Sequence, residues 1–345
     1  MAVRKKLPEL TELLGELTLL GGVSGVENEV RDYIKEKALP YADSIKTDAM
    51  GNLIVFKKGT RRSPKLMLSA HMDEIGLIVT KVTDEGYLKI SPVGGIDIRV
   101  VFGRKVYVGP KEIPGVLGLK AIHLTTQEER TKIPKWSDLY VDIGVSSKED
   151  ALELVSLGDV CTFDSDCVRI GTNEIKAKAI DDRFGCAVML KLLEEKLPVD
   201  TYFVFTVQEE VGTRGAFGAA FSVKPDIALV LEGTTSADFA GVPDSKKVTL
   251  LGAGPVIGFM DAGTIYDRGL FEQIRDIAIK KNIPWQIKGR IAGGTDASAI
   301  QRSREGVRVA SISAPIRNIH SPNTVANLRD IENAYELAKA FVLTI

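Results

Sequence analysis

Two patterns of predicted secondary structure alternate along the chain, and this alternation limits the folds that the chain can adopt. Up to residue 73, and again from about residue 170, apolar runs typical of buried strands alternate with segments whose apolar residues recur at helical spacing. Between them, residues 74–165 contain short strand-like runs separated by turn signals such as Gly94-Gly95, with little helical periodicity. The sequence therefore predicts an α/β fold that is interrupted by an all-β insertion.

The length of the chain supports two domains, because 345 residues are many for one hydrophobic core. We expect residues 1–73 and 166–345 to form a discontinuous domain, a three-layer sandwich in which a mixed sheet is flanked by helices. Residues 74–165 are expected to form a small β-barrel-like domain.

Ser24 precedes a helix predicted over residues 26–37 and is a candidate for its N-cap.

The charge balance and the cysteine content argue against several classes of partner and location. A net charge of -1 and an aromatic content of 6% give no basic patch or stacking surface for nucleic acid, and no charge that favours a membrane surface. The three cysteines contain no C-x-x-C pair, which is typical of a reducing compartment. No apolar run reaches the ~18 residues of a membrane span, and the N-terminal segment resembles an amphipathic helix more than a signal peptide. We expect a cytoplasmic protein.

Side chains that can bind metal ions follow five of the predicted strands. In open α/β sheets the sites form beyond the carboxyl ends of the strands, so these side chains are expected to meet. They are His71, Asp73, Asp181, Asp182, Glu209, Glu210, Glu232 and His320. Any single one could equally be a helix cap or a solvated group. Together they offer two imidazoles and at least three carboxylates, a donor set suited to a pair of divalent ions.

Two adjacent glutamates follow the apolar run FVFTV. Neighbouring side chains on a strand point to opposite faces of the sheet. We therefore expect Glu209 and Glu210 to have different roles.

Five motifs occur in the order and spacing of a known family. They are SAHMDEIG, AIDDRFG, TVQEEVGTRGA, GGTDA and NIHSP, and they extend over essentially the whole chain. In these motifs the chain resembles the dinuclear metallo-aminopeptidases of the tetrahedral (TET) and deblocking type, members of which have also been labelled glutamyl aminopeptidase or endoglucanase. Each motif is weak alone, but the ordered set is specific.

The resemblance implies that Asp181 bridges two divalent ions, which could be zinc, cobalt or manganese. The remaining ligands would be His71 and Glu232 for one ion, and Glu210 and His320 for the other. The family usually has an aspartate at the position of Glu232. Because glutamate is longer by one methylene, this difference could change the metal preference or the occupancy of the site while leaving the residue a ligand.

Three further residues are expected around these ligands. Asp73 would accept a hydrogen bond from the His71 imidazole and fix its tautomer. Asp182 would lie in the same turn as the bridging carboxylate, where the peptide between the two aspartates can be cis. Glu209 would be the general base, because it flanks a ligand without being needed as one.

Other residues are assigned to the substrate pocket by the resemblance alone. Gly294, Thr295 and Asp296 of the GGTDA motif would border it, whereas the local pattern makes Asp296 a candidate helix N-cap. His123 lies in the insertion and could donate a hydrogen bond to a developing oxyanion, with a structural role as the alternative.

The reaction implied by this resemblance is hydrolysis of the N-terminal peptide bond of short peptides, with a water bridging the two ions. A related dinuclear hydrolase acting on N-acyl amino acids or C-terminal residues is an alternative. A glycosidase, such as an endoglucanase, needs two carboxylates about 5–9.5 Å apart across a sugar ring, which adjacent glutamates supply poorly. A non-catalytic scaffold is disfavoured because structural zinc sites are usually closed and tetrahedral.

The resemblance also implies a homo-oligomer. In the family the β insertion forms dimers, and dimers can build a hollow tetrahedral dodecamer that admits peptides and excludes folded proteins.

Overall fold

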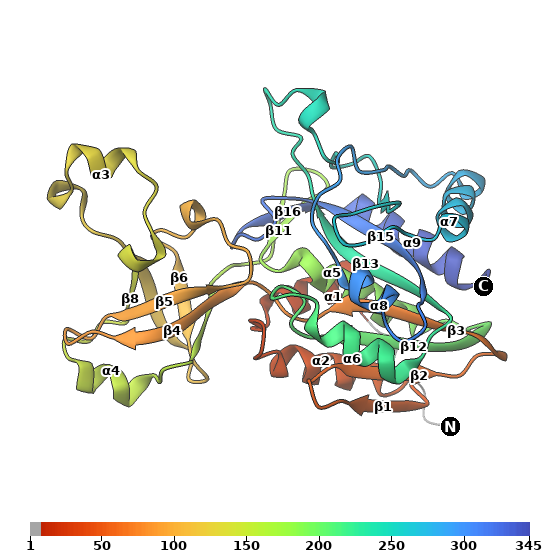
Figure 1. Cartoon of the computed structure of the whole chain (residues 1–345), viewed down its shortest axis with the longest axis horizontal. Helices are drawn as coiled ribbons and strands as arrows, with labels where there is room; N and C mark the ends of the chain where they lie inside the picture. Colours follow the sequence, from red (N-terminus) through yellow and green to blue (C-terminus); the bar gives the residue numbers. More distant parts are fainter. Residues whose placement is uncertain (1–7) are drawn as a thin grey trace.

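The computed structural model describes residues 8–345 and consists of an α/β part joined to a small β-barrel (Figure 1). The α/β part contains a ten-stranded mixed sheet with the order β1-β2-β12-β3-β13-β15-β16-β11-β10, and β14 pairs with β15. Strands β12, β3, β13 and β15 are mutually parallel neighbours, and the other pairs are antiparallel. The predicted fold class is confirmed. The sheet strands are β1 Ser44–Thr47, β2 Leu53–Lys57, β3 Arg61–His71, β10 Val168–Ile170, β11 Glu174–Ala177, β12 Val199–Thr206, β13 Ile227–Thr235, β14 Val256–Ile257, β15 Arg308–Arg317 and β16 Thr324–Asn327.

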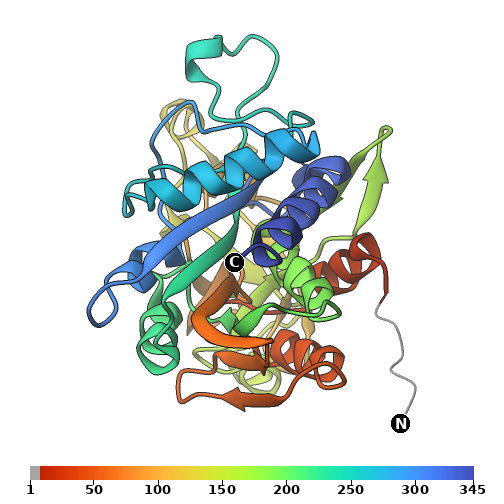
Figure 2. The ribbon, with the colours of Figure 1, turned by 90° about the vertical axis from the view of Figure 1, so that its right-hand side faces the viewer.

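Helices cover both faces of this sheet, which makes three layers. In Figure 2 the sheet runs between α6 and α8 on one side and α5, α7 and α9 on the other. The helices of the α/β part are α1 Leu10–Leu19, α2 Asn28–Ala38, α5 Ile180–Leu192, α6 Arg214–Val223, α7 Arg268–Lys281, α8 Asp296–Gln301 and α9 Leu328–Val342. Within residues 8–345, no helix is both long enough and apolar enough to cross a membrane.

The central strands are apolar on both faces because each face packs against a helical layer. In β3, Leu66 and Leu68 join the core under α1, α2, α5, α7 and α9, whereas Met67 joins the core under α6 and α8. Strand β13 repeats this alternation. Strands buried on both sides therefore appear in the sequence as continuous apolar runs.

The insertion forms a closed six-stranded antiparallel barrel with the order β4-β5-β8-β7-β6-β9. Its core contains inward-facing residues such as Leu77, Val106 and Phe163, and closure leaves no free sheet edge in the barrel. The barrel elements are β4 Gly76–Val82, β5 Leu88–Val93, β6 Lys105–Val108, β7 Ile113–Gly118, β8 Tyr140–Asp142, β9 Val160–Phe163, α3 Gln127–Thr131 and α4 Lys148–Leu154.

The N-cap prediction for Ser24 is wrong. Helix α2 begins at Asn28, and its N-cap residue Glu27 makes no side-chain capping bond. The Ser24 hydroxyl instead donates a hydrogen bond to Asp73 Oδ2 (2.6 Å). A long-range contact has replaced the local cap that the spacing suggested.

A buried ionic cluster joins the two parts of the molecule. Glu74, which lies just before the first barrel strand, has Oε1 at 2.7 Å from Lys178 Nζ and 3.4 Å from Arg183 Nη2. The same oxygen accepts a hydrogen bond from the Gly22 backbone (3.0 Å). All three charged side chains are buried, and burial lowers the pKa of Lys178. One carboxylate thus balances two cations that are held out of water.

We expect Glu74→Gln to lower the free energy of unfolding by about 3–5 kcal/mol, because it removes the carboxylate that pairs with two buried cations. Urea denaturation followed by circular dichroism measures this change. Glu128→Gln is the matched control, since it breaks an exposed ion pair with Lys132 on the barrel and should cost under about 1 kcal/mol. Equal effects of the two substitutions would contradict the prediction.

Candidate metal centre

The candidate ligands meet at the carboxyl edge of the parallel strands. His71 is the last residue of β3, Glu232 lies in β13, and the segments after β12 and β15 carry Glu210 and His320. Asp181 lies in the first turn of α5, where it and Asp182 depart from helical dihedral angles. Parallel neighbours end at one edge of the sheet, so residues distant in sequence are brought together.

The Asp181 carboxylate lies between two imidazole–glutamate pairs. Its Oδ1 is 3.4 Å from His71 Nε2, and its Oδ2 is 3.7 Å from His320 Nε2. His71 Nε2 is also 3.1 Å from Glu232 Oε1, and His320 Nε2 is 3.4 Å from Glu210 Oε2. The two oxygens of one carboxylate therefore face two separate sets of donor atoms.

The chemistry of these donors fits divalent metal ions. Two groups of side chains, each with its ligand atoms within 4.8 Å of one another, could hold an ion: His71 with Asp181 and Glu210, and His71 with Asp182 and Glu232. Nitrogen and oxygen donors of this kind suit zinc and its neighbours in the first transition row. These side chains could therefore hold a metal ion.

The electrostatics of the site favour a cation. Burial raises the pKa of Glu232 well above its ordinary value, and the negative charge of Asp181 adds to this effect. Burial also raises the pKa of Glu210 to about 7, although His320 opposes the shift. For His320, burial lowers the pKa, but the Asp181 and Glu210 carboxylates outweigh it and bring the value to about 9. Carboxylates held this close together out of water are stabilised by positive charge among them.

Asp73 organises the residues around the candidate ligands. Its backbone oxygen is 3.0 Å from His71 Nδ1, while its carboxylate oxygen Oδ1 is 3.5 Å from the same nitrogen. The carboxylate accepts hydrogen bonds from the backbone N–H groups of Glu209 (2.9 Å) and Glu210 (3.1 Å). Burial raises the pKa of Asp73, but its hydrogen bond and charge interaction with His71 outweigh this and lower it. Asp73 thus contacts the imidazole through its backbone oxygen, and its side chain holds the turn that carries the two glutamates.

Asp182 supports the site from the buried side. Its Oδ2 accepts a hydrogen bond from the His71 backbone N–H (3.2 Å), and its Oδ1 accepts one from Gly185 (3.1 Å). The peptide bond between Asp181 and Asp182 is cis. These contacts place Asp182 against the end of β3.

The explanation of the doubled glutamate by strand alternation is wrong. Strand β12 ends at Thr206, and Gln208 has a left-handed backbone (φ 57°), so Glu209 and Glu210 lie in a turn beyond the strand. Asp73 holds this turn by its two hydrogen bonds to the backbone. The Glu209 carboxylate takes part in no hydrogen bond within residues 8–345, and burial together with the Glu232 charge raises its pKa well above the ordinary value.

The substrate-pocket candidates fall in two places. Thr295, and not Asp296, is the N-cap of α8, because its side chain accepts a hydrogen bond from Ala297 N (3.2 Å). Asp296 is buried, accepts a hydrogen bond from Thr206 Oγ1 (2.5 Å) at the end of β12, and has a pKa raised to about 6 by burial. Gly294 is exposed just before this helix. His123 is exposed, in a 3-10 turn over Ile122–Leu124 that precedes α3.

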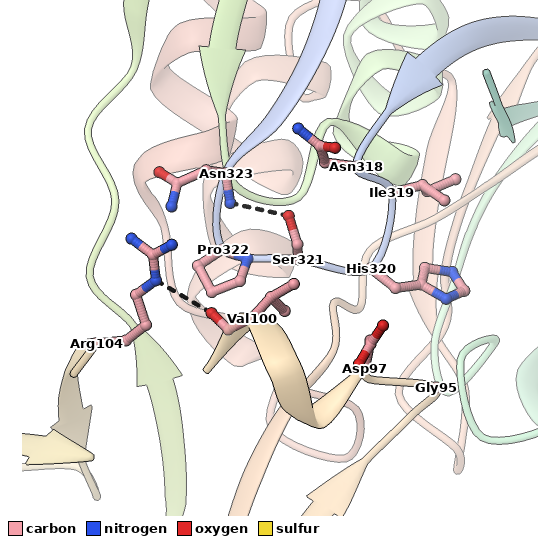
Figure 3. Close-up of a pocket in the computed structure, with 10 residues that line it drawn as sticks. All are labelled: Gly95, Asp97, Val100, Arg104, Asn318, Ile319, His320, Ser321, Pro322 and Asn323. Carbon is pink, nitrogen blue, oxygen red and sulfur yellow. Dashed lines mark hydrogen bonds between the residues drawn. The ribbon is translucent and has the colours of Figure 1, made fainter. Parts of the chain in front are cut away.

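The sequence did not reveal that the barrel forms one wall of the site. A Cβ atom on Gly94 would lie 3.4 Å from Glu210 Cβ, and one on Gly95 would lie 3.5 Å from His320 Nδ1. The glycine pair that marked a turn therefore lets the barrel backbone approach two candidate ligands. A cavity of about 500 Å³ opens beside His320, between the barrel segment 95–104 and residues 318–323 (Figure 3).

We expect Gly233→Ala to weaken metal binding by at least about tenfold in a folded protein. The added Cβ would lie 2.5 Å from Asp181 Oδ1, which accepts a hydrogen bond from the Gly233 backbone (3.0 Å). Titration calorimetry with zinc measures the affinity, and circular dichroism verifies the fold. Gly218→Ala on α6 is the matched control, because nothing lies within 4 Å of its added Cβ. Unchanged zinc affinity in the residue 233 variant would contradict the expected displacement.

Imidazoles and buried carboxylates at the carboxyl edge of a mixed α/β sheet define a metal-site protein of the type that includes metal-dependent hydrolases. Residues 51–337 match the M42 glutamyl aminopeptidase family, and the chain belongs to that family. It is an aminopeptidase, that is, a hydrolase of the exopeptidase class. The predicted family and activity class are confirmed.

Individual relatives agree with this placement over almost the full length of the chain. An aminopeptidase from Desulfurococcus kamchatkensis is 41% identical, with a TM-score of 0.93 and coverage of 97% of this chain and 95% of that chain. A lysyl aminopeptidase from Pyrococcus furiosus is 34% identical over 342 residues, or 96% of each chain. The TET1 peptidase of Pyrococcus horikoshii is 36% identical, with a TM-score of 0.86 and coverage of 98% of this chain and 100% of that chain. That peptidase can assemble into a tetrahedron or a large octahedral shell.

Proposed function

We propose that this aminopeptidase hydrolyses the N-terminal peptide bond of short peptides at a centre that holds two divalent ions. The observation that carries the proposal is the Asp181 carboxylate, whose oxygens face the His71–Glu232 pair and the His320–Glu210 pair. These five residues would hold the ions, which could be zinc, cobalt or manganese. When bound, such ions lower the pKa of water towards neutrality and polarise a carbonyl group.

Glu209 is the proposed general base. Its carboxylate lies beside the ligand Glu210 but is free of hydrogen bonds within residues 8–345, so it can exchange a proton with water or with the leaving amine. The Asp73 carboxylate keeps Glu209 in place by accepting a hydrogen bond from the Glu209 backbone N–H. The negative charge of Asp296 lies close enough to raise the pKa of Glu209 further. Glu209 would transfer the proton, and Asp73 would hold Glu209 in position.

The same proposal covers the organisation of the protein. Residues 1–73 and 166–345 would carry the reaction, and residues 74–165 would mediate dimerisation. The assemblies of the Pyrococcus horikoshii relative support a homo-oligomer, with a tetrahedral dodecamer as one form. A cytoplasmic location is supported by three cysteines that form no disulfide.

Chelator-sensitive release of N-terminal residues should occur from free peptides and not from their N-acetylated counterparts. The reason is that an exopeptidase of this kind recognises the free amine. Incubation of the metal-loaded protein with both sets of peptides, with and without chelator, followed by amino-acid analysis, measures this. Equal cleavage of blocked peptides would favour a hydrolase of N-acyl amino acids, and release from the other end would favour a carboxypeptidase.

Substituting either of the two adjacent glutamates by glutamine should cause a different defect at each position. Glu209→Gln should retain the bound metal and lose about 10²–10⁴-fold in kcat, because it removes the base and no ligand. Glu210→Gln should lower the metal content. Metal analysis by mass spectrometry and steady-state kinetics on the same preparations separate these outcomes. A near-normal kcat in the residue 209 variant would remove the assigned role.

A further inference from the structure

The cavity beside His320 is built by both parts of the chain. One wall is the barrel segment from Gly95 to Arg104, and the other is the loop that follows β15 and carries His320, Ser321 and Asn323. Figure 3 shows His320 on one side of this cavity and Arg104 on the opposite side, next to Pro322 and Asn323. A volume of about 500 Å³ is in the range of small-ligand sites, so the cavity can accept a segment of peptide.

Arg104 is fixed but its charge is not neutralised. Its Nε donates a hydrogen bond to the Val100 oxygen (3.1 Å), which holds the side chain along the cavity wall. Its backbone is anchored on both sides, by Arg104 N to Val101 O (3.3 Å) and by Leu117 N to Arg104 O (2.9 Å). Within residues 8–345 no carboxylate pairs with it, so both Nη groups are available to a ligand. A guanidinium held by one nitrogen presents the others in the geometry that fits a carboxylate.

The other charged groups of the cavity are already paired. Arg99 donates its backbone N–H and its Nε to the Asp97 carboxylate, each at 2.9 Å. His320 faces Glu210 and Asp181, as described above. Of the charged side chains that line the cavity, Arg104 is therefore the one without a counter-ion in the described part of the chain.

We propose that this cavity binds the part of the peptide that follows the scissile bond, and that Arg104 pairs with a carboxylate there. The inference rests on the aminopeptidase function. The N-terminal residue of a peptide substrate has no chain before its amine, so a closed pocket can hold it. The residues after the scissile bond extend away from the metal centre and therefore need a cavity that is open to solvent. The cavity begins at His320, a candidate ligand, and ends at an exposed arginine, so it offers such a path.

Two carboxylates have the chemistry to reach Arg104. One is the C-terminal carboxylate of a peptide of suitable length, and the other is an acidic side chain after the scissile bond. In either case the arginine contributes to substrate binding and not to the chemical step. Its loss should therefore raise KM and leave kcat nearly unchanged.

The test compares Arg104→Gln with the unmodified protein on peptides of two to five residues, each as free acid and as C-terminal amide. The N-terminal residue is the one that the unmodified protein releases fastest from aminoacyl p-nitroanilides. A second set carries the C-terminal amide and one glutamate at successive positions after the scissile bond. Lys105→Gln is the matched control, because it removes a neighbouring exposed charge that pairs with Asp164 and does not line the cavity.

We expect Arg104→Gln to raise KM by about three- to tenfold for free acids of one length, for one glutamate position, or for both. KM for the matching amides, kcat, and p-nitroanilide hydrolysis should stay within about twofold, and Arg104→Lys should recover part of the loss. The free-acid and glutamate sets show which carboxylate is bound.

Three results would overturn the inference: no change in the acid-to-amide ratio at any length or glutamate position, an equal loss in Lys105→Gln, or an altered preference for the N-terminal residue. Failure of the unmodified protein to release residues from any unblocked peptide would instead contradict the proposed function, and this inference with it.

Discussion

Burial of several carboxylates at one point of the sheet edge is the constraint on which the rest of the structure depends. Asp181, Glu210 and Glu232 lose hydration there and their negative charges lie close together, which is unfavourable unless positive charge or hydrogen bonds offset it. The Gly233 backbone fixes Asp181, and glycine is needed because a side chain would occupy the space of the carboxylate. The register of the parallel strands sets the positions of the candidate ligands, and hydrogen bonds orient their side chains.

The four residues from His71 to Glu74 connect this site to the junction of the α/β part and the barrel. His71 faces the carboxylates, Asp73 holds the turn of the two glutamates, and Glu74 balances Lys178 and Arg183 in the buried cluster. The same short segment leaves β3 and enters the barrel.

The barrel therefore borders the candidate metal centre, in addition to any role in oligomerisation. Its Gly94-Gly95 turn approaches Glu210 and His320 to within the space of about one side-chain carbon, and the segment that follows forms one wall of the cavity that ends at Arg104. An insertion that begins beside a ligand strand is well placed to shape the substrate path.

The sequence by itself determined the alternation of the α/β part, the position of the insertion and the residues that meet at the sheet edge. Apolar periodicity is a local property, and polar residues after parallel strands converge whatever the details of the fold. Only the tertiary structure decided how those residues are held. Ser24 binds Asp73 in place of capping a helix, Glu209 and Glu210 lie in a turn beyond the strand, and the barrel backbone approaches two candidate ligands. These contacts join residues far apart in the chain, and their energies depend on burial and distance, which no local pattern of residues encodes.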